Sequence, residues 1–263
     1  MLIIDTHCHA GRNWFEPVET LEFQMDQNGV EGAVLIQHGG TYDNEYLFEA
    51  AARRPGRFKV VVLVDPEDED PLGRLTRLSD QGAAGVRLYP GTTFLHADAA
   101  DIWRKAGELG MVVSTMSSSA EFAGAGFSHL LDACPDTAVV IEHLAGASYS
   151  DAPFAEYEKN LKHAQRPNTS IKVPGLGEIA PRPPRLAADC HFDDGPPLFE
   201  MARDAFGARR MMWGSDFPPC AGREGYANAL NGVRNHQAFA AGGDLEWVLG
   251  RTAAKIWGFD LNT

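Results

Sequence analysis

The chain has 263 residues, of which 44% are hydrophobic and 22% are charged. This composition supports a large buried core and argues against disorder. The formal net charge of -13 argues against nucleic acid or an anionic membrane surface as a binding partner. It leaves room for an anionic small molecule, because a single Arg or Lys can dominate the charge of a pocket.

The cysteines indicate a reducing compartment. Four of them are scattered along the chain without a Cys-x-x-Cys pair, which argues against a disulfide framework and against a thiolate zinc site. The first residues carry no basic segment before their short apolar run, so we expect no signal peptide. No apolar run approaches the roughly 18 residues of a membrane span. We therefore expect a cytoplasmic protein.

Along the chain, short β-branched runs alternate with longer amphipathic stretches, a pattern that predicts strands alternating with helices. The strands are expected at residues 2–6, 33–37, 58–64, 85–88, 112–115, 138–142, 169–173 and 211–214. The helices are expected at residues 18–28, 44–54, 71–80, 98–109, 154–163, 197–206, 226–240 and 245–257.

Eight β-then-α units in a chain of this length predict a single-domain (β/α)8 TIM barrel that spans residues 1–263. The segment 59–64 is apolar over most of its length, as expected of a parallel strand covered on both faces. The Pro-rich segment 174–197 is too long for an ordinary connection, so we interpret it as a cover over the active site. His191 lies in this segment and is a weaker candidate for closing over a substrate.

The most informative motif is His7-Cys8-His9, at the end of the first predicted strand. In an extended chain, residues two apart point to the same side, so both imidazoles can reach one point while Cys8 faces away. Two nitrogen donors that converge in this way suit a divalent metal or a shared substrate oxygen.

Other polar residues fall at the ends of the remaining strands, where the active sites of such barrels lie. In chain order they are Gln37, His38, Asp65, Arg87, His143, Lys172 and Asp216, with Met116 after the fifth strand. The sequence therefore predicts one polar mouth on the barrel.

Several motifs resemble the amidohydrolase-2 branch of the amidohydrolase superfamily. They are residues 4–9, 85–88, 141–146, 212–218 and 248–258, so the resemblance runs nearly end to end. That branch includes metal-dependent hydrolases, decarboxylases, and lactonases that act on small sugar lactones or pyrone dicarboxylates. Residues 33–37 and 43–47 look most like the lactonase side.

The chain departs from the metal-bound relatives in two places. Those relatives usually supply a further histidine after the fifth strand, where this chain has Met116, a poor ligand for hard ions. The lysine that bridges two metals in binuclear relatives is also missing, with Arg87 in the fourth strand instead. We therefore expect either one divalent ion, zinc or manganese, on His7, His9 and Asp216, or no metal, as in the pyrone lactonases.

Two residues are expected to carry the chemistry. Asp216 would take a proton from the attacking water and return one to the leaving group; the competing interpretation is a helix cap. His143 would polarise the scissile carbonyl or stabilise its oxyanion; the competing interpretation is a hydrogen-bonded core histidine. Glu142 should point away from His143 by strand alternation and is expected to be structural.

Arg87 and Lys172 are expected to recognise a substrate carboxylate, and buried ion pairs that hold the barrel together are the competing interpretation. Tyr89 and His38 are expected to line the same pocket. Asp65 is more typical of a turn than of a catalytic residue.

We therefore expect an enzyme that hydrolyses a small carboxylate-bearing lactone or related ester with an activated water. The alternative is a metal-dependent decarboxylase of an unsaturated or aromatic acid. A barrel that only binds ligands is a third hypothesis, since fold alone does not establish catalysis. The expected partner is a small anionic substrate, without nucleic acid or membrane. A homo-oligomer stays open, because Trp14, Phe15, Trp247 and Trp257 suit a core or an interface.

Overall fold

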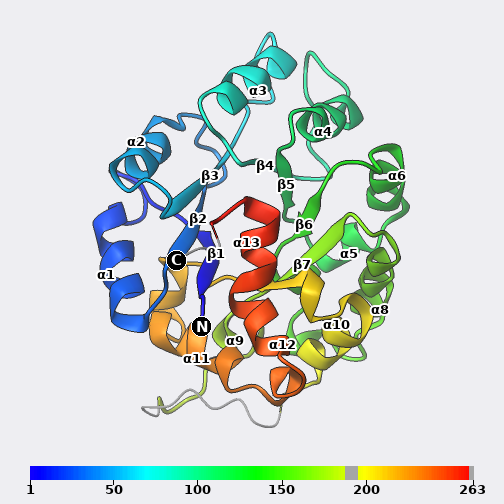
Figure 1. Ribbon diagram of the computed structural model, residues 1–263. Helices are drawn as coiled ribbons and strands as arrows, with labels where there is room; N and C mark the ends of the chain where they lie inside the picture. The colour runs from blue at the N-terminus through cyan, green and yellow to red at the C-terminus, as the bar shows by residue number, and fades with distance from the viewer. Residues whose placement is uncertain (187–194, 261–263) are drawn as a thin grey trace.

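The structure is a computed structural model that describes residues 1–186 and 195–260. Eight parallel strands pair in chain order around a barrel (Figure 1). They are β1 (Ile4–Cys8), β2 (Gly32–Ile36), β3 (Phe58–Val62), β4 (Gly85–Leu88), β5 (Val112–Thr115), β6 (Val139–Ile141), β7 (Thr169–Val173) and β8 (Met211–Trp213). Just beyond the end of β8, the amide of Asp216 donates to the carbonyl of His7 in β1 at 2.9 Å and joins the two strands. The predicted TIM barrel is confirmed.

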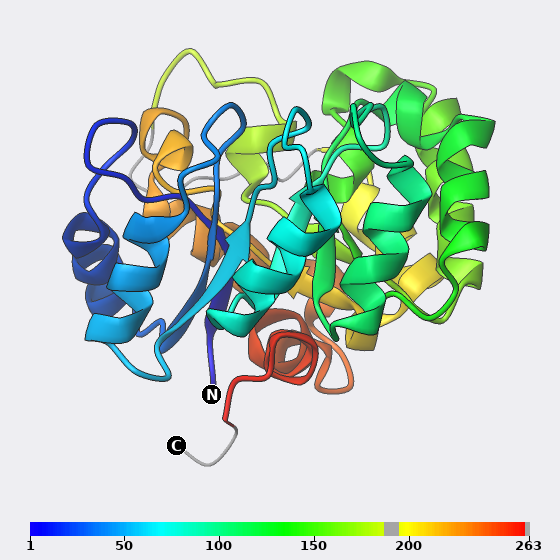
Figure 2. The ribbon, with the colours of Figure 1, turned by 90° about the horizontal axis from the view of Figure 1, so that it is seen from above.

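Helices surround the strands, as the view in Figure 2 shows. They are α1 (Val18–Asn28), α2 (Glu45–Arg53), α3 (Pro71–Asp80), α4 (Ala99–Glu108), α5 (Ser119–Phe122), α6 (Ala125–Ala133), α7 (His143–Gly146), α8 (Ala155–Leu161), α9 (Leu176–Ile179), α10 (Leu198–Phe206), α11 (Tyr226–Arg234), α12 (Asp244–Glu246) and α13 (Thr252–Trp257). Among the described residues, no helix combines the length and apolar character needed to cross a membrane.

Three predicted helices differ from the observed ones. The predicted helix 226–240 ends at Arg234, and a separate 3-10 turn follows at Gln237–Phe239. The predicted helix 154–163 continues beyond α8 only as a 3-10 turn, Lys162–Gln165. The predicted helix 245–257 contains a π-helical turn, Trp247–Arg251, between α12 and α13. Local hydrogen bonding at helix ends is not visible in a periodicity pattern.

One end of the barrel is closed by apolar packing. Interior side chains of the strands form one cluster with residues of α13, including Trp257, and with Phe259. The first residues of β2 and β4 are glycines because these rings lie against them. A Cβ on Gly32 would come within 2.8 Å of Phe259, and one on Gly85 within 2.9 Å of Trp257. The polar mouth therefore lies at the opposite, carboxyl end of the strands.

A β-bulge sets the direction of the first histidines. The pairing of β1 with β2 shifts between Asp5 and Cys8. Ile4 belongs to the cluster inside the barrel, whereas Cys8 packs in the outer core between strands and helices. The extra residue reverses the alternation of the strand. As a result, His7 and His9 both face the interior at the mouth.

Candidate active site

The two histidines of β1 meet as the sequence predicts. Nε2 of His7 lies 3.2 Å from Nε2 of His9, and both side chains are buried. Cys8 points to the other side, where its Sγ lies 3.9 Å from Oγ of Ser215. Nδ1 of His9 lies 2.8 Å from the carbonyl oxygen of Ile36, which fixes the ring and leaves its Nε2 for the mouth.

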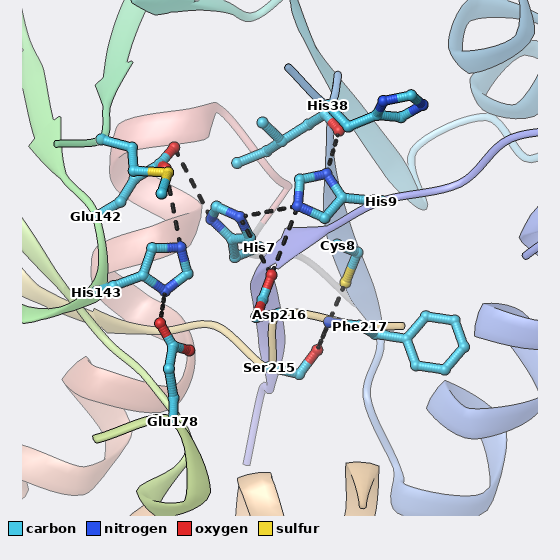
Figure 3. Close-up of polar contacts among 12 residues, drawn as sticks. His7, Cys8, His9, His38, Glu142, His143, Glu178, Ser215, Asp216 and Phe217 are labelled. Atoms are coloured by element: carbon cyan, nitrogen blue, oxygen red, sulfur yellow. Dashed lines mark hydrogen bonds and ion pairs between the residues drawn. The ribbon is translucent and has the colours of Figure 1, made fainter. Parts of the chain in front are cut away.

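Asp216 joins this pair from the end of β8 (Figure 3). Its backbone is in the left-handed region, with φ of 57°, a conformation that non-glycine residues rarely adopt outside functional sites. Its Oδ1 lies 3.7 Å from Nε2 of His7 and 3.5 Å from Nε2 of His9. Burial alone would raise the pKa of Asp216, but the hydrogen bond from His9 and the charge of His143 hold it below its ordinary value.

The distances among these three donors fit a metal ion. Ligands about 2.1 Å from a tetrahedral ion lie roughly 3.4 Å from one another. The observed separations of 3.2, 3.5 and 3.7 Å are close to that value. Two imidazoles and one carboxylate are also the donor types that zinc accepts with a fourth position left open. His7, His9 and Asp216 would hold such an ion, and its chemistry would be to lower the pKa of a bound water.

Lys172 influences which ring nitrogen of His7 carries the proton. Its ammonium, from β7, lies 3.0 Å from Nδ1 of His7 and 3.0 Å from Oγ of Ser114. When Lys172 donates to Nδ1, neutral His7 carries its proton on Nε2 and cannot ligate a metal there. Burial lowers the pKa of Lys172 to about 8, against the opposing charge of Glu142, so its neutral form is accessible near neutrality.

Glu142 does not point away from His143, so that prediction was wrong: its Oε2 lies 3.8 Å from Nε2 of His143. Its carboxylate accepts hydrogen bonds from Arg87 at 2.7 and 3.2 Å and from Ser114 at 2.6 Å. Lys172 lies 3.7 Å from the same carboxylate. Despite complete burial, the charges of Arg87 and Lys172 lower the pKa of Glu142 well below its ordinary value. Glu142 therefore compensates both cations.

The backbone after β6 explains why Glu142 and His143 both reach the site. Val140 faces the barrel interior, so strand alternation also brings Glu142 inward. His143 would then face outward, but its φ of 49° turns the chain and returns the imidazole to the mouth. Its ring lies against that of His7 with centroids 4.3 Å apart. Adjacent residues thus share one site, which alternation alone does not predict.

Glu178 and Arg223 complete the site and were not found from the sequence. Glu178, in α9, lies 2.6 Å from Nδ1 of His143. Burial opposes the charge of His143, but the carboxylates of Glu178 and Asp216 raise its pKa above the ordinary value. Arg223 donates to Asp216 at 2.9 Å and to Glu178 at 3.4 Å. Figure 3 shows Glu178 beneath His143, on the side away from Glu142.

Four other predicted residues, Arg87, Tyr89, His38 and Asp65, make contacts outside the group around His7. The guanidinium carbon of Arg87 lies 5.5 Å from the ring centre of Tyr89. His38 hydrogen-bonds to Thr41 and touches Phe15. Oδ1 of Asp65 accepts the amide of Glu67, which is the turn that its sequence favours.

Two further predictions concern Met116, which follows the fifth strand, and the segment 174–197, the expected cover over the active site. Met116 is at the end of β5, 42% exposed, with its sulfur 3.2 Å from Nη2 of Arg87. The side chain that follows β5 is therefore a thioether in contact with Arg87. The segment 174–197 contains α9, which supplies Glu178. His191 lies outside the described residues.

This barrel, with paired histidines after β1 and an aspartate after β8, defines a TIM-barrel protein of the amidohydrolase type. The chain belongs to the amidohydrolase-2 family, because the family model described as amidohydrolase matches residues 4–259. The resemblance stated from the motifs is thus confirmed, and it supports an enzyme. No match was found among curated proteins.

Solved structures share the fold over nearly the whole chain. An amidohydrolase from Burkholderia multivorans with bound zinc has a TM-score of 0.81 and 18% identity, covering 99% of this chain and 100% of its own. A Pseudomonas putida protein provisionally assigned as a 2-pyrone-4,6-dicarboxylic acid hydrolase has a TM-score of 0.77 and 21% identity, covering 99% of both. The 5-carboxyvanillate decarboxylase from Sphingomonas paucimobilis has a TM-score of 0.65 and 15% identity, covering 98% and 99%.

Proposed function

We propose that the protein hydrolyses a small carboxylate-bearing lactone or a related ester. The observation that carries this proposal is the position of Asp216, whose Oδ1 lies within 3.7 Å of Nε2 of both His7 and His9. A carboxylate held ionised beside two imidazoles, in a mouth that His143 also enters, can activate a water for attack on a carbonyl.

The reaction can be written with these groups. Asp216 accepts a proton from the water as its oxygen bonds to the carbonyl carbon, and the carbonyl becomes an oxyanion. The bond from that carbon to the ring oxygen then breaks, and Asp216 returns its proton to the leaving alkoxide. The product of a saturated lactone is one hydroxy acid, and that of an unsaturated pyrone ring is the enol of a keto acid; in both cases the atoms of one water are added.

His143 is placed to stabilise the oxyanion. Glu178 binds its Nδ1, so Nε2 is the nitrogen available to the mouth, 3.8 Å from Oε2 of Glu142. The raised pKa of His143 favours the imidazolium form, which donates a stronger hydrogen bond to developing negative charge than a neutral ring does.

Arg87 is the stronger candidate for binding a substrate carboxylate. It uses Nε and Nη2 on Glu142 and Met116, and its Nη1 has no hydrogen bond to any residue that the structure describes. Lys172 is fully buried among His7, Ser114 and Glu142. We therefore assign Arg87 to substrate binding and Lys172 to support of the site.

The test is a panel of sugar lactones, pyrone carboxylates and simple esters, assayed for formation of the free carboxylic acid that hydrolysis releases. Turnover of at least one lactone is expected, and Asp216→Asn should lower kcat by about 100-fold or more while substrate still binds. Glu246→Gln, a change at an exposed carboxylate, serves as the control. The proposal is contradicted if no substrate of the panel is turned over and Asp216→Asn binds these substrates more weakly than the wild type does.

The second candidate is a metal-dependent decarboxylase, and one observation favours it. The His7, His9 and Asp216 donors have the separations that a metal ion needs, and a decarboxylase of this kind requires a metal to stabilise developing negative charge. Release of CO2 from unsaturated or aromatic acids, lost on chelation and restored by zinc or manganese, would establish this alternative in place of lactone hydrolysis.

A further inference from the structure

The loop between β1 and α1 presents one aromatic ring to the mouth. The amide of Gly11 donates to the carbonyl of Glu16 at 3.0 Å, which closes the loop into a tight turn. Phe15 lies inside this turn with φ of 62°, in the left-handed region that a bulky residue rarely adopts. Its side chain is nevertheless 45% exposed. Core packing therefore does not explain why this conformation is held.

Phe15 lies directly on a site residue. Its ring stacks on His9 with centroids 5.1 Å apart and planes 19° apart. The ring of His38 lies nearly perpendicular to it, with centroids 4.8 Å apart and planes 88° apart. The ring is thus held by the imidazoles of His9 and His38, and nearly half of its side chain stays exposed beside them.

The aromatic surface continues from Phe15 towards Arg87. Gly39 follows His38, and a Cβ on Gly39 would come within 3.0 Å of the hydroxyl of Tyr89. The ring of Tyr89 in turn lies 5.5 Å from the guanidinium carbon of Arg87. We call Phe15, His38 and Tyr89 the aromatic arc. It joins His9, a candidate metal ligand, to the candidate carboxylate-binding Arg87.

We propose that Phe15 is a specificity residue that selects a planar, conjugated ring over a saturated one. A planar conjugated ring can stack on an aromatic side chain over its whole face, whereas a puckered ring offers that side chain only its axial C–H groups. A planar ring on Phe15 would have its reacting carbonyl beside His9 and Asp216, and a carboxylate substituent could reach Arg87 along the arc. The inference rests on the proposed lactone hydrolysis, and it favours unsaturated pyrone-type lactones over sugar lactones.

The test compares two lactones of equal ring size, a 2-pyrone carboxylate and the corresponding saturated carboxylate. Phe15→Leu keeps apolar bulk but removes the flat face, and Phe15→Trp restores a flat face. We expect Phe15→Leu to lower the ratio of kcat/KM for the planar lactone to that for the saturated one by about three- to tenfold. Phe15→Trp should recover most of that ratio. Phe23→Leu is the matched control, because Phe23 is 60% exposed and lies on α1.

A second measurement separates this inference from the proposed function. Titration calorimetry with isophthalate, a planar ring with two carboxylates that cannot be hydrolysed, reports binding without turnover. Weaker isophthalate binding by Phe15→Leu, with no lactone hydrolysed by any variant, would support the platform and contradict the proposed hydrolysis. Lactone turnover with an unchanged ratio in Phe15→Leu overturns the inference alone. If no lactone is hydrolysed and isophthalate does not bind, both the inference about Phe15 and the proposed hydrolysis are overturned.

Discussion

Arg223 donates a hydrogen bond to Oδ2 of Asp216 at 2.9 Å, which leaves Oδ1 as the carboxylate oxygen that faces His7 and His9. The same guanidinium reaches Glu178, the partner of His143. Arg223 thus fixes the positions of Asp216, the candidate base, and of Glu178, which binds the candidate oxyanion-stabilising His143. Because Arg223 follows β8 by several residues, this relation depends on the loop and not on the strand.

Replacing Arg223 should move the acidic limb of the pH profile. The charge of Arg223 is one of the influences that lower the pKa of Asp216, and Asp216 acts as a base only when ionised. In Arg223→Met that pKa rises, so the acidic limb of kcat/KM should shift to higher pH by about 1 unit. Arg223→Lys should shift it less. An unchanged limb in Arg223→Met would show that Asp216 does not set the profile.

Glu142 should be important for stability as well as for the site. It is buried and pairs with Arg87 and Lys172, so Glu142→Gln leaves two cations without their carboxylate. We expect a loss of about 3–5 kcal/mol in the free energy of unfolding at pH 7, measured by urea denaturation. Glu19→Gln removes an exposed pair with Arg53 and should cost at most about 1 kcal/mol.

The loss at Glu142 should depend on pH in a defined direction. The pKa of Glu142 is lowered in the folded protein, so its stabilising contribution is present above its ordinary value of 4.5 and declines as pH falls below it. The wild type and Glu142→Gln should therefore approach each other in stability at acid pH. Equal costs at pH 7 and pH 4 would contradict the ion pair as the source.

Glu224 should show the opposite pH dependence. Its side chain is buried against Gly175 and Gly177, and neither carboxylate oxygen has a hydrogen-bond partner among the described residues. Burial, opposed by the charge of Arg223, raises the pKa of Glu224 from 4.5 to about 7. The unfolded chain loses this proton first, so the contribution of Glu224 is full below pH 4.5 and is lost as pH rises to 7.

Glu224→Gln removes that titration. Relative to the wild type, the variant should gain stability by roughly 2–3 kcal/mol between pH 4.5 and pH 8, measured by denaturant unfolding at both pH values. Glu246→Gln changes an exposed carboxylate, paired with Arg251, and should show no such gain. If Glu224→Gln and the wild type keep a constant difference, the pKa of Glu224 is not raised by folding.

Zinc should bind at the three donors of the mouth. Their separations predict one zinc per chain, with His9→Gln lowering the affinity at least about tenfold, measured by titration calorimetry and by metal content. His129 lies on α6 outside the cluster, so His129→Gln should leave the affinity unchanged. Zinc affinity that His9→Gln does not alter would show that any bound ion sits elsewhere.

Much of the fold and part of the site follow from simple rules. β4, β5 and β7 have the predicted bounds, because apolar parallel strands between helical segments leave few alternatives. His7, His9 and Asp216 were placed at one mouth because the strands of a barrel all end on the same face. Alternation at His7-Cys8-His9 held because the bulge in β1 precedes it.

The remaining site residues depend on backbone that the pattern does not encode. Glu178 and Arg223 lie in connections, where no periodicity indicates which way a side chain points. Glu142 was assigned to the wrong side because the left-handed backbone of His143 brings adjacent residues into one pocket. The sequence offered two signals for these residues. Glu178 is an acidic residue in a Pro-rich loop, and Arg223 is an arginine shortly after Gly214-Ser215-Asp216. Both patterns are too common to mark a site residue.

The most direct test of the central claim is hydrolysis of the saturated lactone carboxylate in water enriched in oxygen-18, because its product keeps the ring oxygen as an alcohol that does not exchange with water. Addition of water to the carbonyl predicts one labelled oxygen in the new carboxylate of the hydroxy acid after a single turnover, and no label in the hydroxyl. Mass spectrometry of the product reads this directly. Label in the hydroxyl group, or consumption of the substrate with release of CO2 and no hydroxy acid, would contradict the account.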